Sequence, residues 1–168
     1  RATVVSLNTE PLREDFALRY PDLPADRFVV LPNGFDPNDF STIEKNPVSK
    51  SSSGELVLCH AGFLYGVRDP APLLDALMIV REKLGKSGKR VRFIQIGRIQ
   101  VDYDLYERYA ELLADNTFEI LDQMPYAKCL KTMSKADALV NIQPGTKTQV
   151  PSKIYDYLGL GRCILTIT

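Results

Sequence analysis

From residue 55 onward the sequence alternates between short apolar runs and segments of helical periodicity, and this alternation constrains the fold more than any other feature. The apolar runs are five or six residues long, as buried strands are, and they fall near 56–60, 91–96, 117–121, 137–142 and 163–167. Helices are expected between them, over 70–85, 103–113, 126–134 and 151–160. The sequence therefore predicts an α/β fold, a doubly wound parallel sheet with helices on both faces.

The first 54 residues lack this regular alternation. A strand is expected over Ala2–Leu7, a helix over Glu10–Arg19 and a second strand over Arg27–Leu31, which the turn Pro32-Asn33-Gly34 ends. Asn46–Gly54 has the composition of an exposed loop. We expect residues 1–20 to pack as an appendage that is more mobile than the sheet.

Composition and charge exclude several classes of protein. Apolar residues make up 45% of the chain and charged residues 25%, which is ordinary globular composition. Because 21 Lys and Arg balance 21 Asp and Glu, no net charge attracts nucleic acid, and no nucleic-acid partner is expected. No apolar run approaches the roughly 20 residues that span a bilayer, so no transmembrane segment is expected.

The cysteines and the chain start support two further expectations. Cys59, Cys129 and Cys163 lie far apart, form no Cys-x-x-Cys pair and are accompanied by a single histidine. This spacing suits no metal site and predicts buried thiols in a reducing compartment. The chain begins at Arg1 rather than at a methionine, which we interpret as an excised piece of a longer protein.

The loop after the first strand of the regular block is a candidate phosphate site. Gly62 and Gly66 allow close approach of a ligand to the backbone, and the next helix offers its N-terminus to an anion. Arg68 at the mouth of the loop could pair with phosphate oxygens in bidentate geometry. The spacing does not match the Gly-x-Gly-x-x-Gly fingerprint, so a simple strand–helix turn with a solvated arginine is the alternative.

A second candidate anion site lies at the predicted helix that Pro151 begins. Val150, just before it, has no side-chain oxygen to cap the helix, so the first amides, including those of Ser152 and Lys153, are expected to be free. Lys153 and Asp156 are three apart and share a helix face. A cation beside a carboxylate suits a diphosphate next to a ribose diol, and the alternative is an ion pair on a solvated helix.

Weaker candidates follow other predicted strands. His60 lies at a strand end and is expected to be hydrogen-bonded structure rather than a catalytic base. Asp137 precedes a buried run and is expected to be a structural acceptor. Two segments after the second and third strands could wall a base pocket: Gly97-Arg98, and Gln123–Tyr126 with Met124 and Pro125 at its centre.

Four motifs together resemble the group 1 (family 4) glycosyltransferases. They are Leu31-Pro32-Asn33-Gly34-Phe35-Asp36, the strand ending in Ala61-Gly62, Ala136-Asp137-Ala138-Leu139-Val140, and Val150-Pro151-Ser152-Lys153-Ile154-Tyr155-Asp156-Tyr157-Leu158. In that family a Pro-Asn-Gly-x-Asp turn opens the second domain, and a Pro-Ser-Lys-x-x-Glu-Tyr helix binds the nucleotide-sugar. The resemblance implies a GT-B enzyme, with two facing Rossmann-like domains and the donor bound mainly by the second.

The resemblance also implies a division of the chain. Residues 1–31 would end the N-terminal acceptor-side domain, 32–54 would connect the domains, and 55–168 would form a C-terminally truncated nucleotide-sugar-binding domain. The implied partners are a nucleotide-sugar donor and the missing N-terminal domain of the same chain. The implied setting is cytoplasmic biosynthesis of a polysaccharide or glycoconjugate, with any peripheral membrane contact made through the missing domain.

Site residues carry over from the family individually. Asp156 stands where the family has a ribose-binding Glu, and Thr148 stands eight residues earlier in place of the acid that contacts the donor sugar. Arg68 matches the phosphate arginine. The usual lysine after it is missing, and Lys153 is the expected substitute. The remaining expected contacts are the amides of Val150 and Ser152 at the phosphates, and Gly62, Gly145 and Thr146 as donor-sugar or loop contacts.

The implied reaction is transfer of a sugar from a nucleoside diphosphate to an acceptor hydroxyl, with retention. No metal or cofactor is expected, no catalytic residue is identified, and the fragment alone is expected to be inactive. Two alternatives stay open. One is a binding module that keeps the fold without catalysis, which the Thr148 and Asp156 departures favour. The other is a GT-B-type nucleotide-sugar epimerase, which normally needs acid and base side chains, and a single histidine supports it only thinly.

Overall fold

The computed structural model describes residues 2–41, 43, 54–85, 87–145 and 147–168. Its strands are β1 (Val5–Leu7), β2 (Phe28–Val30), β3 (Glu55–Ala61), β4 (Leu64–Tyr65), β5 (Arg90–Ile96), β6 (Ile99–Gln100), β7 (Phe118–Leu121), β8 (Ala138–Ile142) and β9 (Cys163–Ile167). Its α-helices are α1 (Glu10–Arg19), α2 (Ala71–Leu84), α3 (Leu105–Arg108), α4 (Ala110–Ala114), α5 (Tyr126–Met133) and α6 (Lys153–Leu160). Two 3-10 helices complete the set, η1 (Ala25–Arg27) and η2 (Pro37–Phe40). The predicted loop 46–53 lies outside the described residues.

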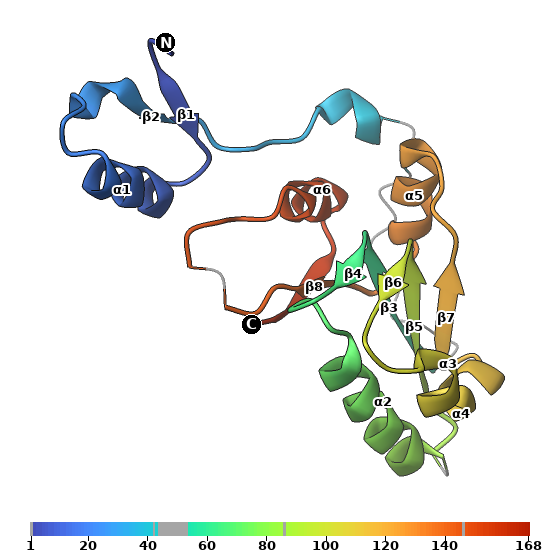
Figure 1. Ribbon diagram of the computed structural model, residues 1–168. Helices are drawn as coiled ribbons and strands as arrows, with labels where there is room; N and C mark the ends of the chain where they lie inside the picture. The colour runs from blue at the N-terminus through green and yellow to red at the C-terminus, as the bar shows by residue number, and fades with distance from the viewer. Residues whose placement is uncertain (1, 42, 44–53, 86, 146) are drawn as a thin grey trace.

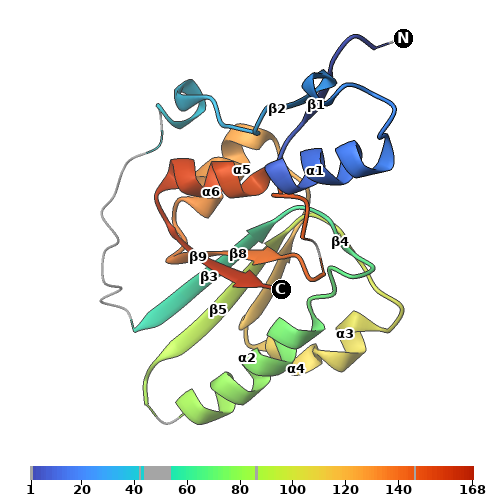
Figure 2. The ribbon, with the colours of Figure 1, turned by 90° about the vertical axis from the view of Figure 1, so that its left-hand side faces the viewer.

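The central sheet has five strands in the order β7-β5-β3-β8-β9, and every neighbouring pair is parallel. This confirms the predicted doubly wound sheet, including all five of its strands. Helices α2, α3 and α4 cover one face and α5 and α6 the other (Figures 1 and 2). Each face buries its own apolar cluster, and these clusters supply the burial free energy that holds the layers together.

The sheet splits at its centre. β3 and β8 pair through only two residue pairs, Leu58 with Ala138 and Cys59 with Leu139, although both strands run on beyond them. The fully buried Tyr157 of α6 bridges the split, because its hydroxyl accepts from the amide of Ala61 at 3.4 Å and donates to the carbonyl of Val140 at 3.1 Å. Strand order reverses at this point, which is where doubly wound sheets bind ligands.

Two of the predicted helices differ from the structure. The helix expected over 103–113 is two short helices, α3 and α4, which are separated at Tyr109. The backbone of Tyr109 has φ −115° and ψ 27°, and its buried side chain donates a hydrogen bond to Asp75 of α2. The last helix begins at Lys153 rather than at Pro151, so Ser152 is its N-cap residue.

The structure also tests the predictions for the three cysteines and for Asp137. Cys59 is buried as predicted and Cys129 is partly buried, but Cys163 is exposed on β9 at the open edge of the sheet, so that prediction is wrong for one thiol. Asp137 is a structural acceptor as predicted, since its carboxylate accepts from the amide of Val57 at 2.7 Å. Its own amide donates back to the carbonyl of Val57 at 2.9 Å.

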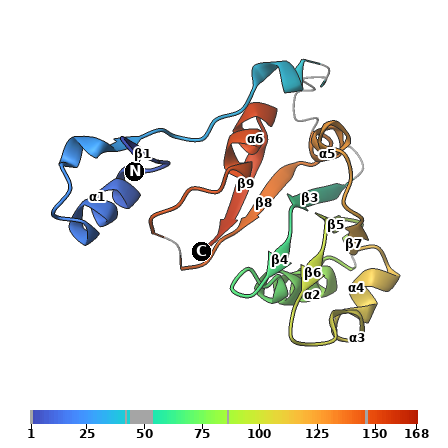
Figure 3. The same cartoon turned by 45° about the horizontal axis from the view of Figure 1, so that its top comes forward.

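The N-terminal residues form a separate small unit. β1 and β2 pair in parallel, and α1, which has its predicted bounds, packs beside them with Thr9 as its N-cap. Figures 1 and 3 show this unit beside the sheet domain, joined to it by the extended chain after β2. That chain leads into η2, whose buried Phe40 packs in the cluster beneath α6. Among the described residues, no helix is long and apolar enough to span a bilayer.

Candidate functional site

A cavity of about 630 Å³ lies at the carboxyl ends of β3, β5 and β7, beside the start of α6. Four separate segments contribute to its wall, and all of them follow a strand or begin a helix. The lining residues are Ala61, Gly62, Phe63, Ile96, Gly97, Arg98, Gln123, Met124, Tyr126, Cys129, Met133, Lys153, Asp156 and Tyr157. The predicted residues Gly62, Gly97, Arg98, Met124, Lys153 and Asp156 are therefore brought together.

Lys153 reaches across the cavity to the end of β3. Its ammonium nitrogen lies 2.7 Å from Nε2 of His60, and Nδ1 of the same imidazole lies 2.7 Å from Oε1 of Gln95 on β5. His60 and Gln95 are fully buried. The expectation that His60 is hydrogen-bonded structure is confirmed. Its link to Lys153 was not predicted, because these residues are 93 positions apart.

The Arg68 guanidinium lies near enough to Lys153 to disfavour its positive charge. Burial, and to a smaller extent the nearby Arg68 guanidinium, lower the pKa of Lys153 to about 8. Burial and the Lys153 charge lower the pKa of His60 to about 3, so the imidazole is neutral at physiological pH. Among the described residues, no carboxylate forms an ion pair with Lys153 or Arg68. An anion at this position would relieve the repulsion between the two cations.

Two glycines make the close approach of these segments possible. Gly62 and Gly97 have φ values of +132° and +106°, which side chains rarely allow. A Cβ on Gly62 would lie 3.1 Å from Nζ of Lys153, and one on Gly97 would lie 3.0 Å from the carbonyl oxygen of Gly62. Both positions thus require glycine, because a side chain would crowd the Lys153 ammonium at Gly62 and the backbone of Gly62 at Gly97.

The start of α6 adds amide donors to the same place. No side chain of the described residues caps the helix, and the first amide hydrogen bonds are those of Ile154 to Pro151 and Tyr155 to Ser152. The amides of Ser152 and Lys153 have no hydrogen-bond acceptor among the described residues. Because α6 begins at Lys153, Ser152 is the N-cap residue rather than a residue of the first turn. The prediction that no side chain caps the helix is confirmed.

Asp156 does not pair with Lys153. Its Oδ1 accepts a hydrogen bond from the Tyr126 hydroxyl at 2.7 Å, and Tyr126 comes from the start of α5. The alternative of an ion pair between Lys153 and Asp156 is therefore wrong in the structure, although both residues line the cavity. Among the described residues, its other carboxylate oxygen accepts no hydrogen bond and could accept one from a hydroxyl group in the cavity.

The predicted arginines lie at the two ends of an aromatic stack. The rings of Phe63 and Tyr65 are stacked with centroids 4.6 Å apart. Arg98 lies over Phe63 at 5.4 Å, and Arg68 lies over Tyr65 at 5.7 Å. These contacts tie the loop that follows β3 to the loop that follows β5, which also pair as the short strands β4 and β6. Phe63 and Tyr65 were not predicted as site residues.

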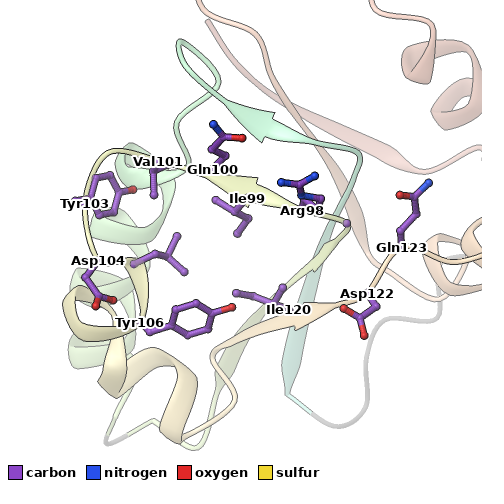
Figure 4. Close-up of a pocket in the computed structure, with 12 residues that line it drawn as sticks. Arg98, Ile99, Gln100, Val101, Tyr103, Asp104, Tyr106, Ile120, Asp122 and Gln123 are labelled. Atoms are coloured by element: carbon purple, nitrogen blue, oxygen red, sulfur yellow. The ribbon is translucent and has the colours of Figure 1, made fainter.

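A second cavity of about 490 Å³ shares Gly97, Arg98 and Gln123 with the first. Figure 4 shows Ile99 and Ile120 between the polar side chains of Arg98, Asp122 and Gln123 and the aromatic rings of Tyr103 and Tyr106. It therefore continues the first cavity from Arg98 and Gln123 toward α3.

Several predicted residues lie outside both cavities, and Arg68 and Ser152 are among them. Pro125 precedes α5 and is exposed, and Val150 is 38% exposed in the loop before α6. Gly145 is exposed, and the carbonyl of Thr148 accepts a hydrogen bond from Thr9 of the N-terminal unit. Thr146 lies outside the described residues. Within the described part of the chain, no three His, Cys, Asp or Glu side chains form a group that could hold a metal ion.

Comparison with known proteins shows which solved structures share this fold. No family model matches the sequence, and no curated protein matches it. Among solved structures, the chain is similar to the pneumococcal O-GlcNAc transferase GtfA in complex with UDP and GlcNAc, with TM-score 0.67 and 14% identity over 98% of this chain and 30% of GtfA. It is similar to Anabaena HepE in complex with UDP, with TM-score 0.68 and 18% identity over 96% of this chain and 44% of HepE.

A trehalose-6-phosphate synthase, described as an enzyme of glycosyl transfer with retention, matches with TM-score 0.67 and 14% identity over 98% of this chain and 46% of the synthase. The chain thus spans less than half the length of each of these proteins. At these identities the comparison establishes the fold, which is the Rossmann-like domain of the GT-B glycosyltransferases.

Proposed function

We propose that this chain is the nucleotide-sugar-binding part of a glycosyltransferase that moves a sugar from a nucleoside diphosphate to an acceptor hydroxyl. One observation carries the proposal. Within the described part of the chain, the Lys153 ammonium has no carboxylate partner, and the Arg68 guanidinium is near enough to lower its pKa. This ammonium lies next to the amides that begin α6, at the point where the strand order of the sheet reverses. The binding of UDP by two similar proteins, GtfA and HepE, supports the nucleotide diphosphate as the anion.

The cavity offers a distinct place for each part of such a donor. The diphosphate would lie between Lys153, Arg68 and the amides that begin α6. The ribose would donate hydroxyl hydrogen bonds to Asp156. The base would lie further along the cavity, between Arg98 and Met124.

The proposed chemistry needs positive charge where the nucleotide leaves. When the bond to the sugar breaks, negative charge develops on the diphosphate, and preorganised cations and amides lower the free energy of that transition state. We assign residues 1–31 to the end of an acceptor-side domain, 32–54 to the connection and 55–168 to the donor domain. The acceptor site would then lie in the other domain, transfer would proceed with retention, and this chain alone would bind donor without turning it over.

The structure bears differently on the two alternatives. An epimerase needs a titrating acid or base, and the only histidine of the chain is buried, bonded at both ring nitrogens and has a pKa of about 3. The histidine therefore gives the epimerase no support, and such an enzyme would have to use another ionisable side chain of the cavity, such as Lys153 or Asp156. A binding module that lacks catalysis would use the same cavity, and a transfer assay on a longer protein that contains this chain would distinguish it from an enzyme.

A titration of the 168-residue chain with nucleoside diphosphates tests the proposal. We expect UDP to bind, and Lys153→Ala to weaken it by about 1–3 kcal/mol, the range for a charged hydrogen bond. Unfolding free energy should change by no more than about 1 kcal/mol, because the buried ammonium is disfavoured in the folded state. Lys83→Ala on the exposed surface of α2 is the matched control and should bind like the parent. Failure of every nucleoside diphosphate to bind would refute the proposed function.

A further inference from the structure

The geometry points to His60 and Gln95 as positioning residues that hold the Lys153 ammonium at the phosphate end of the cavity. They form a buried relay of hydrogen bonds that begins at the carbonyl of Gly62 and ends at the lysine. The inference rests on the proposed function, because it explains how the lysine is presented to a diphosphate. It also predicts the protonation of the imidazole in the protein alone, which can be tested without a ligand.

The first link fixes the side-chain amide of Gln95. Its Nε2 lies 2.7 Å from the carbonyl oxygen of Gly62 and 3.2 Å from that of Ile96. A carbonyl oxygen only accepts hydrogen bonds, so the NH₂ end of the amide must face these two carbonyls. The opposite end, Oε1, is therefore an acceptor that points at the imidazole of His60.

The second link fixes the tautomer of His60. Because Oε1 of Gln95 can only accept, the proton of the neutral ring must lie on Nδ1, 2.7 Å away. Nε2 is then left with a lone pair, which accepts a hydrogen bond from the Lys153 ammonium at 2.7 Å. The burial that lowers the pKa of His60 to about 3 keeps this ring neutral, so the acceptor persists across the physiological range.

The relay opposes two forces that would move the lysine. Arg68 repels the ammonium, and the carboxylate of Asp156, one turn further along α6, would attract a long and flexible side chain. In the structure Lys153 bonds to the neutral imidazole instead, and its charge stays available to a ligand. A side chain that is already ordered loses less conformational entropy on binding, which raises the affinity of the site.

Two substitutions of His60 separate the two bonds of the ring. The amide of His60→Asn can take the place of Nδ1 and bond to Gln95, but it is too short to reach Lys153. The amide of His60→Gln can take the place of Nε2 and accept from Lys153. For UDP we expect the dissociation constant to rise about five- to twentyfold in His60→Asn and no more than about threefold in His60→Gln. Uridine, which has no phosphates, should bind all three proteins equally.

A double-mutant cycle distinguishes positioning from a merely structural role. In a Lys153→Ala background, His60→Asn should change the UDP dissociation constant by less than about twofold, because the group that it positions is gone. If His60→Asn weakens UDP equally with and without Lys153, or weakens uridine as much as UDP, the inference is wrong. Those results would mean that His60 only supports the fold of the loops.

The ligand-free test uses the imidazole itself. His60 is the only histidine, so the nitrogen spectrum of ¹⁵N-histidine-labelled protein shows one ring. We expect a proton on Nδ1, an unprotonated Nε2, no titration between about pH 5 and pH 7, and a shift of the Nε2 signal in Lys153→Ala. A proton on Nε2, or titration near the ordinary histidine pKa, would overturn the relay. If UDP does not bind the parent protein while this spectrum is as expected, the proposed function fails and the relay stands.

Discussion

The Lys153 ammonium is held in surroundings that disfavour its charge. It is partly buried, lies near the Arg68 guanidinium, and has a neutral ring as its hydrogen-bond acceptor. The resulting pKa of about 8 places its titration close to physiological pH, whereas an ordinary lysine stays charged well above it. The occupancy of the charged form therefore becomes a measurable property of the site.

Donor affinity should consequently fall at alkaline pH. Below a pH of about 8 the ammonium is charged and can bind a diphosphate, and above it the neutral amine cannot. Between about pH 7 and pH 9.5 we expect the UDP affinity to fall roughly tenfold, as the charged hydrogen bond is lost. His60 does not titrate in this window, because its pKa is about 3. Calorimetric titration across this range measures the effect.

Lys153→Arg is the control for that profile, because a guanidinium stays charged throughout it. Its UDP affinity should be flat over the same pH range, whatever its absolute value. An equally steep decline in Lys153→Arg would assign the titration to another group and remove the phosphate role from Lys153.

Asp156 can be tested by removing either the carboxylate or the hydroxyls that it would bind. Asp156→Asn replaces one acceptor oxygen by a donor, so we expect a loss of about 1–2 kcal/mol in UDP binding. The 2′,3′-dideoxy form of UDP should lose little more on mutation, since its hydroxyls are already absent. Titration calorimetry on the four combinations gives the coupling.

Two outcomes decide the role of Asp156. Coupling between mutation and ligand supports direct contact with the ribose, and simple addition of the two losses excludes it. Tyr126→Phe is a useful companion variant, because it removes the hydrogen bond to Asp156 without changing the carboxylate. If Tyr126→Phe lowers UDP affinity less than Asp156→Asn does, the carboxylate of Asp156 matters more for binding than the hydrogen bond by which Tyr126 orients it.

Residues on a single segment were within reach of sequence analysis, and partners from other segments were not. Helix spacing put Lys153 and Asp156 on one face, and the cavity contains both. Their actual partners, His60 and Tyr126, come from β3 and α5, at separations of 93 and 30 residues. Only the strand order brings those segments together, and no local pattern encodes it.

At the scale of elements, apolar runs determined what could be predicted. β9 was predicted with its observed bounds and β5 to within one residue. The break between α3 and α4 was not, because it depends on Tyr109 reaching the carboxylate of Asp75 on α2. The start of α6 at Lys153 was also missed, since Pro151 fits the first turn of a helix equally well.

The split between β3 and β8 leads to a prediction about Tyr157. Its hydroxyl satisfies the amide of Ala61 and the carbonyl of Val140, where the strands no longer pair with each other. Tyr157→Phe leaves both buried groups without this partner, so the unfolding free energy should fall by about 1–3 kcal/mol. Denaturant unfolding with unchanged m-value measures it.

Tyr106→Phe is the matched control, because that side chain is 66% exposed and the same substitution there removes a hydroxyl in solvent. Its stability should match the parent. A Tyr157→Phe protein as stable as the parent would show that water or a shift of β8 replaces the hydroxyl at the split.

At the scale of the whole molecule, the N-terminal unit and the sheet domain are joined by few interactions. Among the described residues, the one hydrogen bond between residues 2–31 and the rest runs from the Thr9 hydroxyl to the carbonyl of Thr148. Thr148 lies in the loop that leads into α6, so this single bond connects the unit to the loop beside the cavity. The unit itself has a two-stranded sheet and a helix, α1, without a buried residue.

Hydrogen exchange should therefore show two levels of protection. Opening of β1, α1 and β2 exposes little apolar surface, so their amides should exchange orders of magnitude faster than those of β3 and β5, which open only with the whole sheet. Mass spectrometry of peptides after exchange measures both in one sample. UDP should slow exchange in residues 60–68 and 150–156, which include the proposed phosphate-binding residues, and leave residues 2–31 unchanged. Equal protection in both units, or slowing by UDP throughout residues 2–31, would show instead that the N-terminal unit folds and closes together with the donor site.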